Sequence, residues 1–362
     1  MSKKAITLLG VGDVLIDREK PETIFQHVAE VLRSGDITYA NCEGALSDKG
    51  YPNPLQAAHS DPKNLNAFLH AGIDVVSLAN NHSQDWGKEA LLDTMARLKE
   101  AGVSYIGVGK NLTEARRPVI LERKGTKVGL LAYCCVGPEG SGYEAEDDKP
   151  GYAPVRSWTI YEKVDPQPGT WPRIVSIPYK EDLAAMVDDI EKLKETVDVV
   201  VIAFHWGLHI IPRIIPMYCI DIGHAAVDAG ADLILGTHVH ILKAIEMYNG
   251  KAIFHSTGNF ALELGPHMRD YKHVRDVDQL YGVSPEHEEH RKTLIAKAVI
   301  EGGEIKRVSY IPCYINEQTE PEIVTRSDPR GQDVFNYMED VSRSEGFNVR
   351  FSWDGDEVLI MP

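Results

Sequence analysis

Short runs rich in valine, isoleucine and leucine alternate with amphipathic stretches through the first two thirds of the chain. This alternation is typical of an α/β fold, because each face of a buried sheet needs helices to cover it. Between two of the runs, Asp182 to Lys194 places five apolar side chains at helical spacing, which predicts one buried helix face. The predicted core strands span residues 5–11, 37–41, 73–78, 103–106, 128–133, 197–204 and 233–235.

The last third of the chain has a different pattern. Residues 252–255 and the pair 294–300 and 305–311, joined around Gly302-Gly303, predict antiparallel strands, so the sheets are expected to be mixed. Beyond residue 317 the chain turns polar and rich in proline, and then predicts a helix over 332–343 and two short strands. We therefore divide the chain into a main domain, residues 1–317, and a C-terminal appendage, residues 318–362.

Two segments interrupt the alternation, and both are expected to be surface excursions. Residues 137–179 combine prolines, glycines and acids with little periodicity. Residues 263–291 contain His267, His273, His287 and His290, but the run His-Glu-Glu-His at 287–290 lacks the i, i+4 histidine spacing of a zinc-protease helix. A polar loop is the expected structure there, with a lid over substrate as the alternative.

Charge and composition exclude several classes of protein. The chain has 38 Lys and Arg against 54 Asp and Glu, a formal net charge of −16, which argues against a nucleic-acid partner. No apolar run reaches the roughly 20 residues of a membrane-spanning helix. Asp13 and Asp17 interrupt the apolar start, which favours a strand over a secretion signal. Five scattered cysteines indicate neither a disulfide framework nor a cysteine zinc site. We expect a cytoplasmic protein without a membrane partner; nothing in the sequence specifies its oligomeric state.

Polar side chains able to bind metal recur directly after the predicted strands. Ligands of open α/β sheets bind beyond the carboxyl ends of the strands, where several loops converge. The most specific local pattern is Gly236-Thr237-His238-Val239-His240, where a tight turn after a strand aims two imidazoles at one cavity. Carboxylates, amide oxygens and imidazoles suit divalent Zn, Mn, Fe or Ni without any thiolate. The residues in question are Asp13, Asn41, Glu43, Asn80, Asn81, His82, Asp85, His205, His209, His238 and His240.

Taken together and in order, these motifs resemble those of the CapA family, named for poly-γ-glutamate capsule synthesis, within the calcineurin-like metallophosphatase superfamily. The similarity runs from about residue 5 to about residue 315. It implies a four-layer α/β/β/α sandwich with two mixed sheets and a dinuclear metal centre at the strand ends. The motifs are Asp13, Asn41-x-Glu43-Gly44, Asn80-Asn81-His82-x-x-Asp85-x-Gly87, His205-Trp206-Gly207, Gly236-x-His238-x-His240 and Ser256-x-Gly258-Asn259-Phe260.

The resemblance also implies roles for individual residues. Asp13 and His240 would hold one metal ion, and Glu43 takes the place of the bridging carboxylate. Asn81, His205 and His238 would hold the second ion. His82 resembles the histidine that faces the reacting group, with Asp85 to orient it.

Three positions depart from the family pattern. The usual D-x-H start is Asp13-Val14-Leu15 here, so one metal ion lacks a histidine ligand. His209 stands where Glu is expected, and His255 where Tyr is expected.

Two divalent ions in such a site acidify a bridging water and polarise a phosphoryl or carbonyl oxygen, so no serine or cysteine nucleophile is needed. The resulting hypothesis is a metal-dependent hydrolase that acts on a phosphoester or on an amide or peptide bond, with His82 as the proton donor. One alternative is a peptide epimerase that uses the same metals and a base such as His209. Another is a non-catalytic component of capsule biosynthesis.

Substrate specificity is expected to reside in the loops around the predicted site. Tyr51, Trp86 and Arg213 are the predicted wall residues, with Arg213 able to grip a carboxylate or phosphate. These residues favour a small or peptide-like anionic substrate as the partner.

Overall fold

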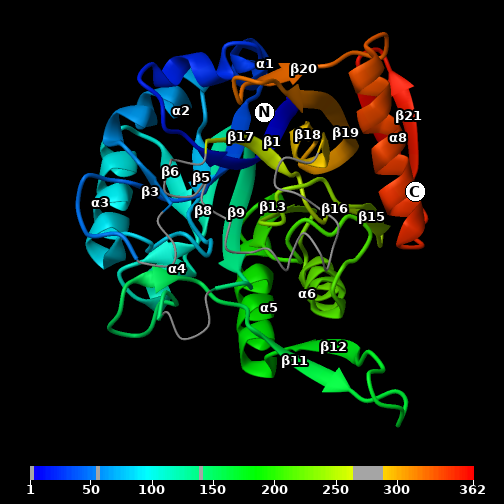
Figure 1. Ribbon diagram of the computed structural model, residues 1–362. Coiled ribbons are helices and arrows are strands. Elements are labelled where there is room, and N and C mark those ends of the chain that lie inside the picture. Colours follow the sequence, from blue (N-terminus) through cyan, green and yellow to red (C-terminus); the bar gives the residue numbers. More distant parts are fainter. Residues whose placement is uncertain (1–3, 54–57, 138–141, 264–287) are drawn as a thin grey trace.

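Two mixed β-sheets form the centre of the molecule in the computed structural model, which describes residues 4–53, 58–137, 142–263 and 288–362 (Figure 1). In the first sheet, β1 runs parallel to β2 and antiparallel to β18. Two further strands join at its side: β17 (Asn259–Leu262) pairs with β1, and β20 (Pro321–Ile323) pairs with β19. In spatial order the main strands are β21 (Arg350–Asp354), β22 (Glu357–Met361), β19 (Glu304–Ile315), β18 (Lys292–Glu301), β1 (Ile6–Leu15), β2 (Ile37–Cys42), β5 (Val75–Ser77) and β6 (Ser104–Ile106).

The second sheet has a parallel centre with antiparallel edges. β13 runs parallel to both β9 and β14, and β8 is antiparallel to β9. Its order is β15 (Ile245–Tyr248), β16 (Lys251–Phe254), β14 (Leu233–Thr237), β13 (Val199–His205), β9 (Thr126–Cys134) and β8 (Val119–Arg123). The prediction of an antiparallel strand at 252–255 is therefore incomplete. β16 is antiparallel to β15, but the tight turn at Asn249-Gly250 returns it beside β14, to which it runs parallel.

The strand β13 shows how the layers pack. Val199 and Val201 point between the two sheets and share the large buried cluster with β1, whereas Val200 and Ile202 point outward into the cluster beneath the helices. A strand with both faces covered reads as a continuous apolar run, which explains its sequence. α5 (Lys180–Lys194) and α6 (Met217–Asp228) cover the outer face of the second sheet, and α1 (Ala29–Ser34), α2 (Leu65–Ala71) and α3 (Gly87–Glu100) cover the first.

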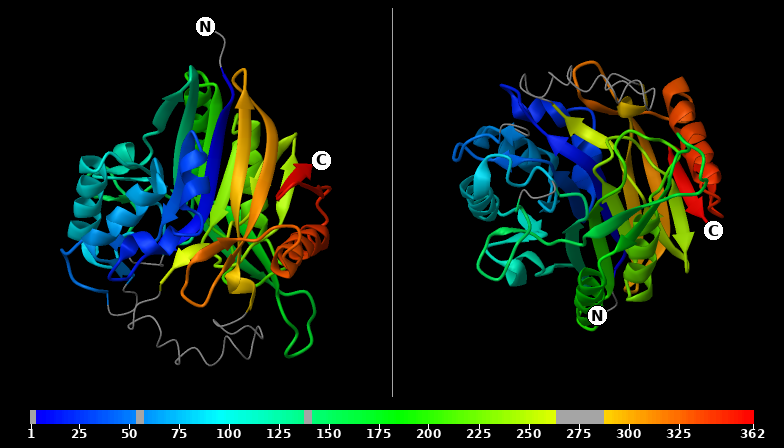
Figure 2. Two further views of the ribbon diagram at one scale, coloured as in Figure 1. Left: turned by 90° about the horizontal axis from the view of Figure 1, so that it is seen from above. Right: turned by 60° about the horizontal axis from the view of Figure 1, so that its bottom comes forward.

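The predicted fold class, two mixed sheets between outer layers of helices, is confirmed, and the layers can be followed in Figure 2. The helix predicted over 182–194 begins two residues earlier. Close packing of the strands depends on glycine: a Cβ at Gly12 would fall 1.8 Å from the carbonyl oxygen of Gly258, so β1 and the residues before β17 could not approach. No helix in the described part of the chain has the length and apolar character needed to cross a membrane.

The C-terminal residues continue the first sheet. α8 (Pro329–Ser344) begins at Pro329 because the Asp328 carboxylate accepts a hydrogen bond from the backbone N–H of Arg330, and β22 pairs with β19. Val334 and Met338 of α8 belong to the same buried cluster as β1. The predicted helix and two strands are present, while the domain boundary at residue 317 stays a prediction.

The excursion expected at residues 137–179 contains strands that its sequence did not predict. β10 (Gly151–Tyr152) pairs with β7 (Val108–Gly109), beside α4 (Leu112–Ala115), and a projecting hairpin follows, formed by β11 (Ser157–Glu162) and β12 (Arg173–Pro178). The remaining short elements are β3 (Ala45–Leu46), β4 (His59–Ser60) and the 3₁₀ turns Pro21–Phe25, Pro62–Asn64 and Glu288–Arg291. His267, His273 and His287, with most of the second predicted excursion, lie outside the described residues.

Candidate metal centre

The predicted metal ligands come from five strand ends that meet at one edge of the two sheets. Asp13 lies on β1, and the strand pairing places it beside Asn41 of β2 on one side and Asn259 of β17 on the other. Asn41 donates a hydrogen bond from Nδ2 to Asp13 Oδ1 over 2.8 Å. The register of three adjacent strands thus fixes the Asp13 carboxylate in the middle of the site.

Asp13, Glu43 and His240 form a first group whose ligand atoms all lie within 4.8 Å of one another. Nδ1 of His240 is 3.6 Å from Asp13 Oδ2, and its Nε2 is 3.6 Å from Glu43 Oε1. Both carboxylates are buried, whereas the His240 side chain keeps 20 % of its surface exposed. His240 is thus the most exposed member of the first group.

The electrostatics of the first group favour a bound cation. Burial raises the pKa of Glu43 to about 7, and burial together with the Glu43 charge raises the pKa of Asp13 well above its usual range. Oε2 of Glu43 is buried without a hydrogen-bond partner among the described residues. An oxygen-rich site with an unsatisfied buried carboxylate fits a divalent ion, which would offset the cost of burying the charge.

Asn81, His205 and His238 form a second group beside the first. Nε2 of His205 lies 2.7 Å from Asn81 Oδ1 and 3.2 Å from His238 Nδ1. Burial and the neighbouring imidazoles hold the pKa values of both histidines well below their usual range, so both rings are neutral and can offer a lone pair. The backbone N–H of His238 donates to Asp13 Oδ2 over 3.2 Å, which links the two groups.

The loop after β14 holds two histidines in an unusual backbone conformation. His238 has φ of 99° and His240 has φ of 60°, in the left-handed region that non-glycine residues rarely adopt. Strain of this kind costs about 1–3 kcal/mol per residue and persists where the surrounding structure enforces it, often at functional sites. In this backbone conformation the His240 ring lies in the first group and the His238 ring in the second.

His82 and Asp85 form a buried pair next to Glu43. Nδ1 of His82 is 2.7 Å from Asp85 Oδ2, which also accepts a hydrogen bond from the backbone N–H of Ala58, and Nε2 of His82 is 3.8 Å from Glu43 Oε1. Burial lowers the pKa of His82, but the Asp85 hydrogen bond and the nearby carboxylates outweigh it and raise the pKa overall. The surrounding carboxylates therefore stabilise the protonated form of His82 relative to a free imidazole, and Nε2 faces Glu43 of the first group.

The remaining predicted site residues lie at different distances from the two groups. The His209 ring packs on His238, with 4.0 Å between ring centroids, and on His240 at 5.3 Å. Trp86 stacks on His59, whereas Tyr51 is 89 % exposed. Arg213 forms an ion pair with Asp340 of α8. The substrate-binding roles of Tyr51, Trp86 and Arg213 stay predictions, as do the ligand roles above.

Three side chains around the ligands had no assigned role in the sequence analysis. Asn259 Oδ1 lies 2.8 Å from His240 Nδ1, and Thr237 Oγ1 lies 3.0 Å from His205 Nδ1. Such partners fix ring orientation and tautomer in metal sites. Asn259 belongs to one of the sequence motifs named above, and Thr237 lies between Gly236 and His238 of another. The sequence therefore contained a pattern that could have pointed to both residues. His290, whose Nδ1 lies 3.1 Å from the carbonyl oxygen of His240, is one of the four histidines noted in the excursion at residues 263–291, but no motif assigned it to the site.

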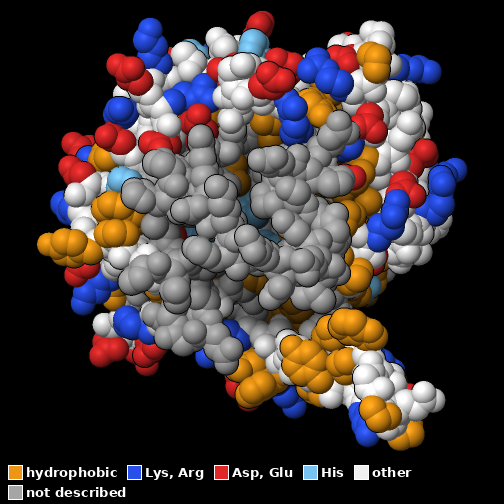
Figure 3. Space-filling model, viewed as in Figure 1, with side chains coloured by type: hydrophobic (Ala, Val, Ile, Leu, Met, Phe, Trp, Pro, Cys, Tyr) orange, Lys and Arg blue, Asp and Glu red, His pale blue; other side chains and the backbone are white. Residues whose placement is uncertain are grey.

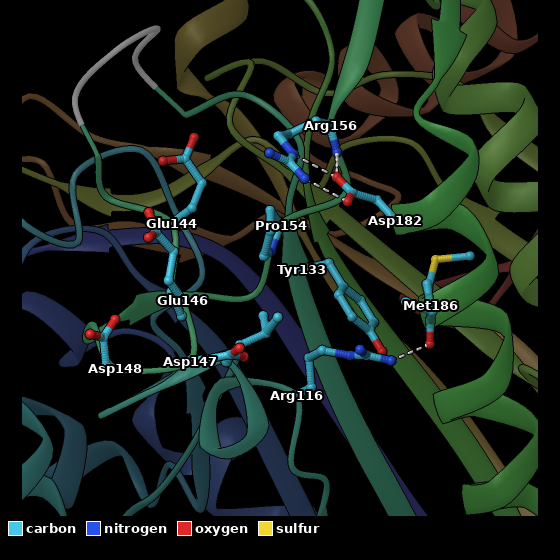
Figure 4. A pocket seen from close by; sticks show the side chains of 13 residues that line it. Arg116, Tyr133, Glu144, Glu146, Asp147, Asp148, Pro154, Arg156, Asp182 and Met186 are labelled. Carbon is cyan, nitrogen blue, oxygen red and sulfur yellow. Dashed lines mark hydrogen bonds and ion pairs between the residues drawn. The ribbon is translucent and has the colours of Figure 1, made fainter.

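A separate cavity of about 580 Å³ lies between α4, β9 and α5, and no predicted metal ligand lines it (Figure 4). Its wall carries Glu144, Glu146, Asp147 and Asp148. Its two arginines already have carboxylate partners, Arg116 with Asp189 and Arg156 with Asp182. Chemistry based on the clustered imidazoles therefore belongs to the strand-end site and not to this cavity.

Comparison with known proteins agrees with the motif pattern. The model of the family described as "Bacterial capsule synthesis protein PGA_cap" matches residues 7–263. The chain is 28 % identical over 274 residues to the "PGA biosynthesis protein CapA" of Bacillus subtilis, covering 70 % of this chain and 63 % of that protein. It is 27 % identical over 277 residues to the "Capsule biosynthesis protein CapA" of Bacillus anthracis, covering 72 % and 60 %. The chain thus spans less than two thirds of the length of these relatives.

Two solved structures show a weaker likeness. A "novel phosphatase" from Mycoplasma pneumoniae is 16 % identical with a TM-score of 0.49, covering 93 % of this chain and 100 % of that one. The "calcineurin-like phosphoesterase YfkN" from Bacillus subtilis is 12 % identical with a TM-score of 0.43, covering 94 % and 99 %. Both scores lie below 0.5, so the family assignment depends on the family model.

Proposed function

The chain belongs to the bacterial capsule synthesis protein PGA_cap family, and from this premise we propose that it is a divalent-metal-dependent hydrolase that serves the biosynthesis of a poly-γ-glutamate-type polymer. The relatives named for PGA and capsule biosynthesis support the biological setting. The substrate we propose is a phosphoester or an amide bond in a small or peptide-like anionic molecule.

One observation carries the proposal of metal-dependent chemistry. The ligand atoms of Asp13, Glu43 and His240 converge within 4.8 Å, and both carboxylates are buried without a lysine or arginine partner among the described residues. In a purely structural cluster, a lysine or arginine would be expected beside each buried carboxylate, because an unpaired buried charge costs several kcal/mol. A cation-binding role explains why these carboxylates remain.

The residues of this chain would divide the work between binding and proton transfer. Asp13, Glu43 and His240 would hold one divalent ion, and Asn81, His205 and His238 a second. When bound, such ions act as Lewis acids and lower the pKa of water. Asp85 orients the His82 ring through Nδ1, so that a proton on Nε2 points towards the first group and is available to a leaving group.

The test is elemental analysis of the purified protein together with hydrolysis assays in the same samples. The variants are Glu43→Gln and His238→Ala, with Glu89→Gln and His70→Ala as matched controls, because both control residues are exposed on helices and neither is a predicted site residue. We use bis(p-nitrophenyl) phosphate and a γ-linked glutamyl peptide as substrates. We expect bound metal and turnover in the wild type and in both controls, and loss of both in the two site variants.

Other outcomes separate the alternatives. Metal binding with deuterium uptake at Cα in heavy water, and without bond cleavage, would replace the hydrolase by an epimerase. Metal binding with neither reaction on any tested substrate would favour a non-catalytic role in capsule biosynthesis. Full activity in His238→Ala would refute the proposed site.

A further inference from the structure

The hairpin formed by β11 and β12 projects from the body of the protein as an arm, defined here as residues 157–178 (Figures 1 and 3). Its two strands pair with each other and with no other described strand. At its base, the Ser176 hydroxyl accepts a hydrogen bond from the backbone N–H of Tyr218 on α6, and Trp158 stacks on Tyr179. Beyond this base the arm extends away from both sheets.

The arm concentrates the exposed apolar surface of the molecule. Of the thirteen large hydrophobic side chains exposed in the described part of the chain, seven lie on the arm. Trp171 is 78 % exposed and Tyr161 is 69 % exposed. Figure 3 shows hydrophobic side chains gathered along the projecting arm. The seven residues are Trp158, Ile160, Tyr161, Val164, Trp171, Ile174 and Ile177.

The strand register places apolar side chains on both faces of the hairpin. Trp158 lies opposite Ile177 on one face, and Tyr161 lies opposite Ile174 on the other. If the arm folded back against its own body, it would cover one face and leave the other in water. The two-sided pattern therefore calls for a partner outside this molecule.

We propose that the arm is the docking surface for a second copy of this chain, in a two-fold symmetric dimer. A stable interface buries about 800 Å² per partner. An aromatic side chain buries about 150–250 Å². Because the seven apolar side chains occupy both faces of the arm, one contact can bury only part of them, and the paired strand edges would supply further area, contributed equally by each copy in a two-fold dimer.

The charge of the arm also favours a second copy. Within residues 157–178, Glu162 and Asp165 balance Lys163 and Arg173, so the arm is neutral in a chain of net charge −16. Two copies can meet through their arms without bringing acidic surfaces together.

The edges of the hairpin point to the strand that would meet its copy. β11 contains no proline, whereas β12 follows Pro172 and ends at Pro178. Proline often protects the edge strand of a sheet from pairing with another chain. β11 is therefore the open edge, and antiparallel pairing of β11 with its copy satisfies two-fold symmetry.

The test is sedimentation velocity on the full chain over a range of concentrations. The variants are Trp171→Asp and Tyr161→Ser, and the control is Ile120→Asp, which alters a residue of β8 that is 46 % exposed and outside the arm. We expect the wild type and the control at twice the chain mass of 40.2 kDa. We expect both arm variants as monomers, with the dimer dissociation constant raised at least about 30-fold, as for an aromatic hot spot. Circular dichroism confirms that each variant is folded.

A wild type that remains a monomer at about 100 μM, well above typical Kd values for specific dimers, would overturn the proposal. Dimers that persist in both arm variants would overturn it as well. Co-sedimentation of monomers with vesicles of phosphatidylcholine and phosphatidylglycerol, lost in Trp171→Asp, would assign the arm to a lipid surface instead. None of these outcomes depends on metal binding or on hydrolysis.

Discussion

The buried carboxylate of Asp93 and the two buried carboxylates of the candidate metal centre differ in their charged neighbours. Asp93 of α3 has two cationic partners, Lys49 at 2.6 Å and Arg97 at 2.6 Å, and a hydrogen bond from Ser47, which together lower its pKa to about 2 against the effect of burial. Among the described residues, the only potentially cationic side chains that form ion pairs with Asp13 and Glu43 are imidazoles, and the pKa values of both carboxyls are raised. The scaffold carboxylate has its cationic partners within the chain, whereas the site carboxylates have no lysine or arginine partner among the described residues and could bind a cation.

The largest expected difference between the two sets is in metal dependence. Addition of Mn²⁺ to metal-stripped protein should raise its free energy of unfolding by about 4 kcal/mol at roughly 1,000 times the dissociation constant. The Glu43→Gln variant should lose most of this gain, and Asp93→Asn should keep it. Thermal unfolding with and without metal measures both. An equal metal response in wild type and Glu43→Gln would contradict the assigned ligand.

The next difference concerns pH. A carboxyl whose pKa is raised in the folded state destabilises that state when ionised, and this penalty fades as the pH falls from about 7 towards the ordinary value of 4.5. The contribution of Glu43 to the stability of the metal-stripped protein should therefore rise on acidification across this range, at about 1.4 kcal/mol per pH unit for one group, against the opposite effect of the buried histidines whose pKa values are lowered. Chemical denaturation of wild type and Glu43→Gln at several pH values measures it. The variant should lack most of the gain.

The scaffold carboxylate should behave in the opposite way. Its lowered pKa means that Asp93 contributes stability above the ordinary value of 3.8, and that this contribution is lost as the pH falls towards 2. The Asp93→Asn variant should lose about 1–2 kcal/mol at neutral pH, a value reduced for the solvent that screens its partners. Metal content should stay at the wild-type level. Urea denaturation with elemental analysis checks both expectations.

The smallest effect is expected for one partner of Asp93. The Lys49 side chain is 60 % exposed, so its ion pair is largely screened. Lys49→Met should cost at most about 0.5 kcal/mol, because Arg97 and Ser47 still satisfy the carboxylate. A loss as large as that of Asp93→Asn in urea denaturation would mean that Lys49 is the dominant partner.

Most of the fold was predictable because buried strands and helices leave periodic apolar patterns. β13 and β9 appeared as continuous apolar runs and the buried face of α5 as a helical stripe. The hairpin of β11 and β12 was not predicted, because its apolar residues are exposed on both faces and follow no inside-outside alternation. For β16 the sequence predicted antiparallel pairing but not its parallel pairing with β14, because a local sequence pattern does not specify the order of strands in a sheet.

The residues of the candidate site were found in the sequence because each lies near the end of a strand or just after it, and strand ends of an open sheet converge. The sequence did not show which of these side chains contact one another. The contact of His240 with Asn259 and the hydrogen bond from the His238 backbone to Asp13 join segments far apart in the chain. The partner of Arg213 likewise lies 127 residues away, on α8.

The sequence by itself determined the α/β class, most strands, the ordered motifs and the types of ligand, because these depend on local periodicity and side-chain chemistry. Only the tertiary structure decided which carboxylates have a cationic partner and which do not. It also decided that seven large apolar residues of the arm are exposed among the residues that the structure describes. Burial, strand register and charge pairing arise between distant segments, so they exist only once the chain has folded.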